Sequence, residues 1–337
     1  MKFIAKDLLA KRKPAAQFAK GINLAEHIRL SPAGGGQHVA EFIGTGDFAS
    51  AFYERQRYEV DAGRAEEPLL YPALYTVVQD PSLPKEVTVY QLGPGGVVFS
   101  EIKEGGEVKF STVSESSKTV PIVHYAAGLE YSKDLVVFNQ QWTLGIFERA
   151  AGIAWNALLN HIHLYPIISA TYTAANQTAA DATGGTLEEK YLRTIEAGMT
   201  AASMDTTNPR RGPYDLLVST SDLFMIERAM ARRYQDGIDV QSSAIGRIQN
   251  VIAYDGTSLS RGKKSVTYPG VSAGKAYLVS KQYSAMDFLS FIKQDLEFMS
   301  GDGDISRFIL EQVVGDAYLG VYANPTAAVE ELTWPTS

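Results

Sequence analysis

The sequence contains no cysteine. Disulfide bonds, thiolate metal sites and cysteine nucleophiles are therefore excluded, and the composition is typical of a protein made in a reducing compartment. The first residues, MKFIAKDLLAKRK, lack the continuous apolar run of a secretory signal because lysines interrupt them. From these absences we expect a soluble protein made in the cytoplasm.

An overall excess of basic residues is also lacking. The formal net charge is −7, which argues against a dedicated nucleic-acid binder because such domains are usually basic. Apolar residues make up 45% of the chain and charged residues 20%, so the sequence can bury an ordinary core. Its 337 residues suffice for about two domains or one elaborated domain.

Recognisable catalytic and metal-binding motifs are absent as well. No G-x-S-x-G, P-loop or H-E-x-x-H pattern occurs. His161 and His163 lie two apart in a predicted helix and so point to different faces. The acidic turn at Asp302 resembles a calcium loop, but its twelfth position is Val313 instead of glutamate, which predicts a hairpin turn. We therefore predict no catalytic residue, no cofactor and no metal site, and expect that the protein is not an enzyme.

One glycine-rich segment resembles a dinucleotide fingerprint. Gly44–Ala49 reads G-x-G-x-x-A before a charged helical stretch. A Pro- and Tyr-rich segment then replaces the strand–helix–strand pattern that would support nucleotide binding. A helix capped by Asp47 is the favoured interpretation, and an α/β nucleotide-binding enzyme using Gly44–Ala49 is kept as the alternative from a different functional class.

The most prominent feature present is a long helical stretch, predicted from Ser132 to Leu164. It contains no proline, and Ser132 is placed to cap its start. Apolar residues lie on nearly every face, so the helix must be covered on several sides. Small residues such as Gly152 allow other elements to approach it closely.

A glycine-hinged β-ribbon precedes this helix. Alternating residues predict a strand from Glu86 to Gln91, followed by a glycine-rich hinge. Val97–Lys103 and Glu107–Val113 are two further extended runs joined by Gly105-Gly106, which is typical of a hairpin. A lone two-stranded hairpin is marginal in water, so we expect its apolar face to lie on another molecule.

The remaining elements are predicted from caps and apolar runs. A capping box at Thr186 starts a helix that ends near Met204, and Ser219 or Ser221 caps a second helix. Short strands and two long closing strands complete the prediction: Thr119–Leu129, Tyr214–Ser219, Val251–Tyr254, Lys275–Val279, Phe288–Met299 and Ile305–Tyr322. Arg261–Lys264 is read as a basic loop.

In this order the parts resemble a major capsid protein of tailed bacteriophages, whose shell fold is the Hong-Kong-97 type. The likeness covers nearly the whole chain and depends on the order of its motifs. The residues that carry it are the ribbon Val97–Val113, the segments Thr119–Val123 and Glu130–Asp134, the long helix, and the ending Gly315–Val321 with Ala327–Val329.

The resemblance implies an α+β capsid fold with an N-terminal arm, an extended β-hairpin loop, a peripheral domain built on the long spine helix, and an axial domain. The implied boundaries are 1–62 for the arm, 93–118 for the extended loop, 63–92, 119–204 and 281–337 for the peripheral domain, and 205–280 for the axial domain.

It also implies a function. The chain would self-assemble into hexamers and pentamers of an icosahedral shell that encloses phage double-stranded DNA, and so reside in the virion. The extended loop would make intersubunit contacts through Val98, Ile102, Lys103, Lys109 and Phe110. The basic arm would face packaged DNA non-specifically through Lys2, Lys6, Lys11, Arg12 and Lys13.

Further partners follow from the same resemblance. No long, charged, helical N-terminal extension is seen, so such a protein would either use a separate scaffold protein or have lost the extension by processing, and the initiating Met1 favours a separate scaffold. A portal and a decoration protein are also expected, and no membrane. An encapsulin-like nanocompartment shell protein, which shares the fold and encloses cargo enzymes, is the nearest alternative.

Overall fold

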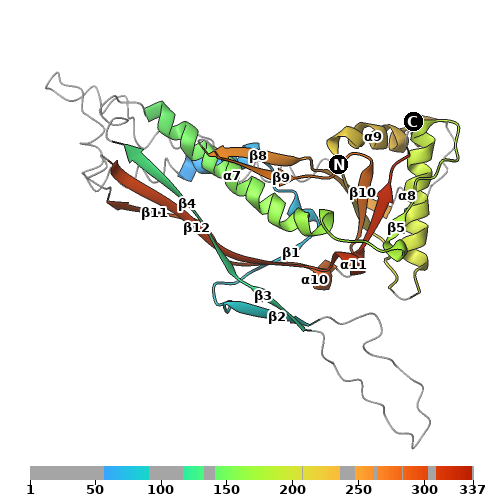
Figure 1. Ribbon diagram of the computed structural model, residues 1–337, viewed down its shortest axis with the longest axis horizontal. Coiled ribbons are helices and arrows are strands. Elements are labelled where there is room, and N and C mark those ends of the chain that lie inside the picture. The colour runs from blue at the N-terminus through green and yellow to red at the C-terminus, as the bar shows by residue number, and fades with distance from the viewer. Residues whose placement is uncertain are drawn as a thin grey trace, which may run out of the picture.

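The computed structural model describes residues 57–90, 117–132, 141–206, 208–235, 247–261, 264–282, 284–302 and 309–335. The molecule is elongated, with a long helix and a four-stranded sheet at one end, a five-stranded sheet with two helices at the other, and a short two-stranded ribbon beside them (Figure 1). Most of the predicted arm, most of the extended loop and the Gly44–Ala49 segment lie outside the described residues.

The long helix α7 spans Gln141–Ile168. The prediction of a long helix here is confirmed, but its start was wrong. Ser132 is the last residue of strand β4 (Val123–Ser132), where it pairs with Ile309, so it does not cap the helix. The helix also continues past Leu164 through Pro166. Strand pairing therefore overrides the local capping signal, since it satisfies backbone groups of the whole segment.

The four-stranded sheet has the order β1-β11-β12-β4. The two closing strands are confirmed as β11 (Phe288–Asp302) and β12 (Ile309–Ala323), an antiparallel pair. β4 pairs antiparallel with β12, and β1 (Thr76–Gln79) pairs parallel with β11 at the edge. β1 was not predicted.

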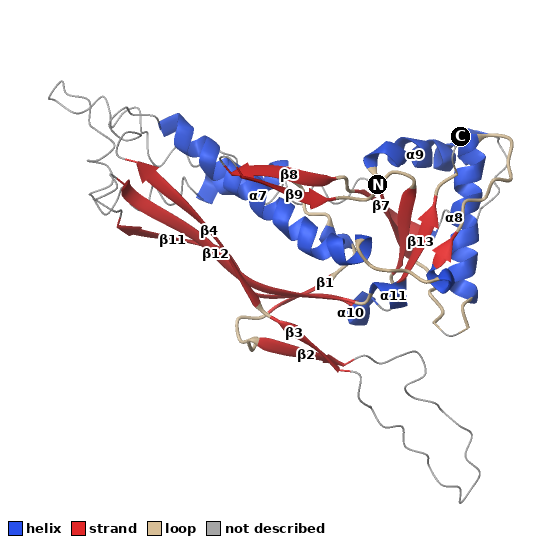
Figure 2. Cartoon of the chain, viewed as in Figure 1, coloured by secondary structure: helices blue, strands red, loops and turns tan. Residues whose placement is uncertain are grey.

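Helix α7 packs on one face of this sheet. Trp155 and Leu159 of α7 share a buried cluster with Ala317 and Leu319 of β12. A second hairpin, β8 (Gly256–Arg261) with β9 (Lys264–Pro269), lies along α7 (Figure 2). The predicted basic loop at Arg261–Lys264 is thus the tip of a hairpin, with Arg261 ending one strand and Lys264 beginning the other.

The five-stranded sheet has the order β5-β13-β10-β6-β7. The predicted strands are confirmed as β6 (Tyr214–Val218), β7 (Ile248–Ala253) and β10 (Lys275–Ser280). The sheet also contains β5 (Gln177–Thr178) and β13 (Val329–Thr333). Both predicted helices are confirmed as α8 (Leu187–Met204), capped by Thr186, and α9 (Thr220–Gln235). Their apolar residues pack on one face of the sheet.

The end of α7 covers the other face of this sheet. Leu164 and Ile167 share a cluster with Leu217, Tyr277 and Val279. Strands buried on both faces read as continuous apolar runs, which explains why YDLLV and KAYLVS could be predicted from the sequence.

Short elements connect these parts. They are the helical residues 57–66, the 3₁₀ turns at Tyr71–Ala73 and Ala174–Asn176, the helical turns α10 (Ser284–Asp287) and α11 (Pro325–Ala328), and the ribbon strands β2 (Glu86–Tyr90) and β3 (Ser117–Pro121).

Residues 57–75 attach to α7 through buried polar side chains. Asn156 donates to the carbonyl oxygens of Arg64 and Glu67, both at 2.7 Å. Asn160 accepts from Leu70 N at 2.8 Å and donates to Pro68 O at 2.9 Å. The two side-chain amides thus supply hydrogen-bond partners to backbone groups that have no partner in a neighbouring helix or strand.

The small residues of α7 allow close approach, as the sequence predicts. A Cβ at Gly152 would overlap the backbone of Val60, and a Cβ at Gly63 would overlap the backbone of Arg149. Gly63 and Gly152 therefore allow direct backbone contact where the helical residues 57–66 cross α7.

Candidate assembly surface

The face of the four-stranded sheet opposite α7 is largely open to solvent. Its cross-strand rows are Met299 with Val314 and Gly128, and Glu297 with Asp316 and Ala126. Met299 is 59% exposed and Val314 is 39% exposed. We call this set, together with His124, Tyr318 and Glu130, the bare face. An antiparallel sheet can leave one face in water, and the exposed apolar side chains of Met299 and Val314 make this face a candidate surface for another molecule.

A polar and aromatic group lies within the bare face. The His124 ring stacks on the Tyr318 ring with centroids 4.3 Å apart. His124 Nε2 lies 3.4 Å from Asp316 Oδ2, and Asp316 is itself 6% exposed. The arrangement joins β4 to β12 and places one buried carboxylate beside an exposed imidazole.

The β2–β3 ribbon is anchored at one end of the same face. Val89, Val120 and Ile122 form a buried cluster with Phe291 and Tyr322 of the sheet. Tyr90 and Ser117, the residues on either side of segment 91–116, are the last pair of the ladder and are therefore held side by side. The predicted intersubunit residues Val98, Ile102, Lys103, Lys109 and Phe110 lie in that segment, outside the described residues, and so do the predicted DNA-facing residues of the arm.

Ion pairs hold strand β13 in place, and the sequence analysis did not predict them. Glu330 is 1% exposed, and Arg210 donates to its Oε2 at 2.9 Å while Thr178 donates to its Oε1 at 2.7 Å. Burial raises the pKa of Glu330, while the hydrogen bonds and the guanidinium oppose that rise. Glu331 points to the other side of the strand, where it pairs with Lys275.

The two helical histidines lie on different sides of α7, as predicted. His163 is fully buried, with Nδ1 donating to Leu159 O at 2.7 Å and Nε2 accepting from Ser290 at 2.8 Å. Burial lowers the pKa of His163 to about 4, so the ring is neutral. His161 stacks instead on Tyr268 of the β8–β9 hairpin. His163 thus connects α7 to strand β11, and His161 connects α7 to the β8–β9 hairpin.

Within the described ranges, no three histidine, aspartate or glutamate side chains gather as metal ligands. Over the same ranges, no helix has the length and apolar character needed to cross a bilayer. A cavity of about 230 Å³ lies between α7, the four-stranded sheet and the β8–β9 hairpin, and its lining is mostly apolar, as in Trp155, Leu259 and Phe298.

Comparison with solved structures shows a shared fold. The chain superposes on the capsid structure of the cyanophage P-SCSP1u with a TM-score of 0.50 and 14% identity, over 80% of this chain and 89% of that chain. It also matches a virus-like particle from Pyrococcus furiosus (TM-score 0.49, 12% identity, 83% and 98% covered). A further match is the capsid of the Myoviridae phage XM1 (TM-score 0.49, 10% identity, 79% and 91% covered).

No protein-family model and no curated protein sequence matches the chain. The predicted fold is confirmed by the cyanophage capsid structure: the chain has an α+β fold of the Hong-Kong-97 capsid type.

Proposed function

We propose that this chain is a major capsid protein of a tailed bacteriophage, which assembles into hexamers and pentamers of an icosahedral shell around double-stranded DNA. The observation that carries the proposal is the likeness to the cyanophage capsid structure over 89% of that chain. A shell subunit acts by contact, so we assign it no catalytic residue and no cofactor, and place it in the virion.

The bare face supports this proposal independently of the comparison. Its exposed Met299 and Val314 form one cross-strand row, and a monomer gains nothing from leaving such a row in water. In a shell, a neighbouring subunit would cover it.

We further propose the domain roles implied by the resemblance. The spine helix α7 with the four-stranded sheet is the peripheral unit, and residues 205–280 form the heart of the axial unit. Because β5 and β13 hydrogen-bond into the five-stranded sheet and α8 packs on it, the axial unit also draws on residues 177–204 and 329–333.

The remaining proposed partners are a separate scaffold protein, a portal and a decoration protein. The extended loop, through residues such as Ile102 and Phe110, is proposed to lie over a neighbouring subunit. The basic arm, through residues such as Lys11 and Arg12, is proposed to contact packaged DNA without sequence preference.

Electron microscopy of the purified full-length protein tests the proposal directly. Closed shells of tens of nanometres are expected, whereas a small monodisperse particle under all assembly conditions would refute a shell function. Deletion of Glu101–Lys109 gives a second test. The variant should stay folded and soluble but form no shells, and normal shells would exclude the proposed role of the loop.

Two alternatives are separated by further measurements. An encapsulin-like shell would enclose cargo protein in place of DNA, which nuclease treatment and mass spectrometry of purified particles distinguish. A nucleotide-binding enzyme using Gly44–Ala49 would lose nucleotide binding in the Gly46→Asp variant, while a capsid protein carrying this change would still assemble.

A further inference from the structure

The cavity of about 230 Å³ beside α7 has walls from three parts of the fold. Helix α7 contributes Ala154 and Trp155, the β8–β9 hairpin contributes Leu259 and Tyr268, and the four-stranded sheet contributes residues such as Phe298. These elements are far apart in the sequence, so the cavity forms only when the subunit is folded. We call this space the α7 cavity.

The lining of the α7 cavity is apolar. None of the described residues that line it carries a charge, and their polar side-chain groups are the hydroxyls of Tyr125 and Tyr268 and the indole N–H of Trp155. Protein interiors have few spaces larger than a water molecule. Water occupies such a space only where it finds about two to four polar partners. The lining therefore suits an apolar molecule better than water.

The indole of Trp155 in this wall lacks a hydrogen-bond partner. Trp155 is 8% exposed, and its Nε1 is buried without an acceptor among the described residues. Buried N–H groups are nearly always hydrogen-bonded. Because the Trp155 ring is part of the cavity wall, an acceptor atom in the cavity can reach the indole after a small tilt of the ring.

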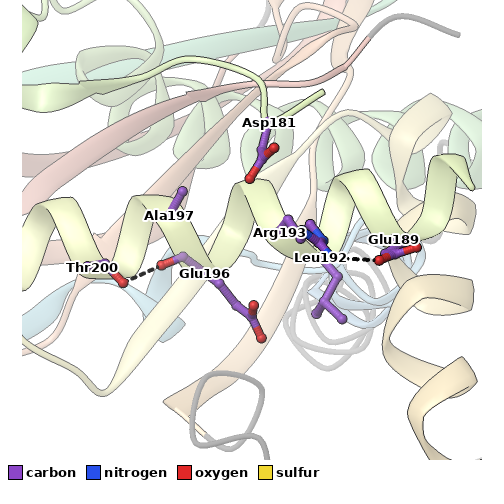
Figure 3. Close-up of a pocket in the computed structure, with 7 residues that line it drawn as sticks. All are labelled: Asp181, Glu189, Leu192, Arg193, Glu196, Ala197 and Thr200. Carbon is purple, nitrogen blue, oxygen red and sulfur yellow. Dashed lines mark hydrogen bonds and ion pairs between the residues drawn. The ribbon is translucent and has the colours of Figure 1, made fainter. Parts of the chain in front are cut away.

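A larger hollow beside α8 provides a chemical contrast. It has a volume of about 470 Å³ and is lined by polar residues such as Asp181, Glu189 and Arg193 (Figure 3). Arg193 donates to Glu189 at 2.8 Å and to Thr183 at 3.2 Å, so its guanidinium already has partners. An apolar molecule would displace water from charged groups there, so we expect it to prefer the α7 cavity.

We propose that the α7 cavity binds a small uncharged molecule with an apolar body and one hydrogen-bond acceptor, which faces Trp155 Nε1. A cavity of about 150 Å³ holds benzene in another protein, so this larger one suits a ring with a short substituent. The bound molecule contacts α7, the sheet and the β8–β9 hairpin together and stabilises their packing. The site belongs to the folded subunit and does not depend on shell assembly.

Three probes of similar shape test the ligand chemistry. Isopropylbenzene is apolar, acetophenone has a carbonyl oxygen in place of one methyl group, and benzoate carries a negative charge. Calorimetric titration of the full-length protein should show binding of the two uncharged probes and none of benzoate, because a charge buried without a partner is unfavourable. Benzoate binding as tight as that of acetophenone would refute the proposal, as would no binding of acetophenone up to its solubility limit.

Filling the cavity tests where the probes bind. Ala154→Leu places a longer apolar side chain in the wall and should weaken binding of both uncharged probes by at least about tenfold. Ala150→Leu, at an exposed position of α7 outside the lining, is the matched control and should bind like the wild type. If circular dichroism shows that Ala154→Leu does not fold, Ala151→Leu in the same wall replaces it. Undiminished binding by the folded variant would refute the site.

Trp155→Phe tests the hydrogen bond. The change keeps an aromatic ring but removes the N–H group, so the affinity of acetophenone relative to isopropylbenzene should fall by about 3- to 10-fold. The ratio cancels changes of cavity shape that affect both probes. Trp334→Phe is the matched control, because Trp334 Nε1 is also buried without an acceptor but Trp334 stacks on Tyr191, away from the cavity. An unchanged ratio in Trp155→Phe would refute the assigned acceptor.

Hydrogen exchange locates the bound probe without a substitution. Acetophenone should slow exchange in residues 151–158 of α7 and in the β8–β9 hairpin, and leave β6 and α8 unchanged. Slowing confined to the five-stranded sheet and its helices would refute the site. If acetophenone binds as described but the protein forms no shells, the proposed function fails and this site stands. If shells form and acetophenone does not bind, the site fails and the shell function stands.

Discussion

The two sheets of this molecule differ in how they are covered. The five-stranded sheet is enclosed by its own chain, with α8 and α9 on one face and the end of α7 on the other, and every residue of β6 is buried. The four-stranded sheet has α7 on one face and the bare face on the other, and every residue of β1 is exposed. The chain therefore covers both faces of the first sheet itself, while it leaves one face of the second sheet in contact with solvent.

Truncation of a core residue in the five-stranded sheet should give the largest effect. Leu278 is 1% exposed, so Leu278→Ala should lower the free energy of unfolding of the isolated subunit by about 2–5 kcal/mol. Val314→Ala on the bare face is the matched control and should cost about 0.5 kcal/mol or less. Urea unfolding measures both, and equal losses would contradict the difference between the sheets.

The pH dependence of stability tests the covered side of the four-stranded sheet. The pKa of His163 is about 4 when folded and rises to its ordinary value of 6.5 on unfolding. The contribution of neutral His163 to the free energy of unfolding is therefore fully present above pH 6.5. It is lost as the pH falls toward 4, because the unfolded chain binds the proton more tightly than the folded chain. About 3 kcal/mol should be lost over this window.

His163→Gln removes this titration and serves as the comparison. The difference in unfolding free energy between wild type and variant should shrink as the pH falls from 6.5 to 4. A difference that is constant with pH would show that His163 does not titrate in this way. Because Ser290 lies on β11, the loss should also loosen the contact between α7 and that sheet.

A smaller effect is expected where residues 57–75 join α7. Asn160→Ala leaves Leu70 N and Pro68 O without their partner, which should cost about 1–3 kcal/mol. Hydrogen exchange should show the loss concentrated in residues 57–75, with the five-stranded sheet unaffected. Thr200→Ala, on the exposed face of α8, is the control. If hydrogen exchange increased equally in residues 57–75 and in the five-stranded sheet, residues 57–75 would not unfold independently of that sheet.

The same contrast explains what the sequence could predict. β6 and β10 are continuous apolar runs, and Thr186 with Glu189 is a local capping pattern, so these elements were predicted correctly. β1 has four exposed residues and no alternation of buried and exposed positions, and it forms because β11 pairs with it. The start of α7 was misplaced because pairing of β4 with β12, a contact distant in sequence, decides the structure of Ser132.

The candidate surfaces were less predictable than the fold. The extended loop could be proposed from glycine spacing, but the bare face arises from the registry of Met299 with Val314 and Gly128, three residues on separate strands. The Arg210–Glu330 pair joins positions far apart in the chain. No local pattern distinguishes Glu330 from a solvent-exposed glutamate in a strand.

The smallest effect on the subunit should accompany a clear effect on assembly. Met299→Gln replaces a side chain that is 59% exposed, so the free energy of unfolding should change by about 0.5 kcal/mol or less. If the bare face is covered in the shell, the same change removes apolar surface from that contact and should raise the protein concentration needed for assembly, which light scattering can follow. Glu130→Gln, elsewhere on the bare face but without loss of apolar surface, is the control. If Met299→Gln assembles like the wild type, the exposed row is an ordinary solvent-facing surface, and the four-stranded sheet does not need a partner.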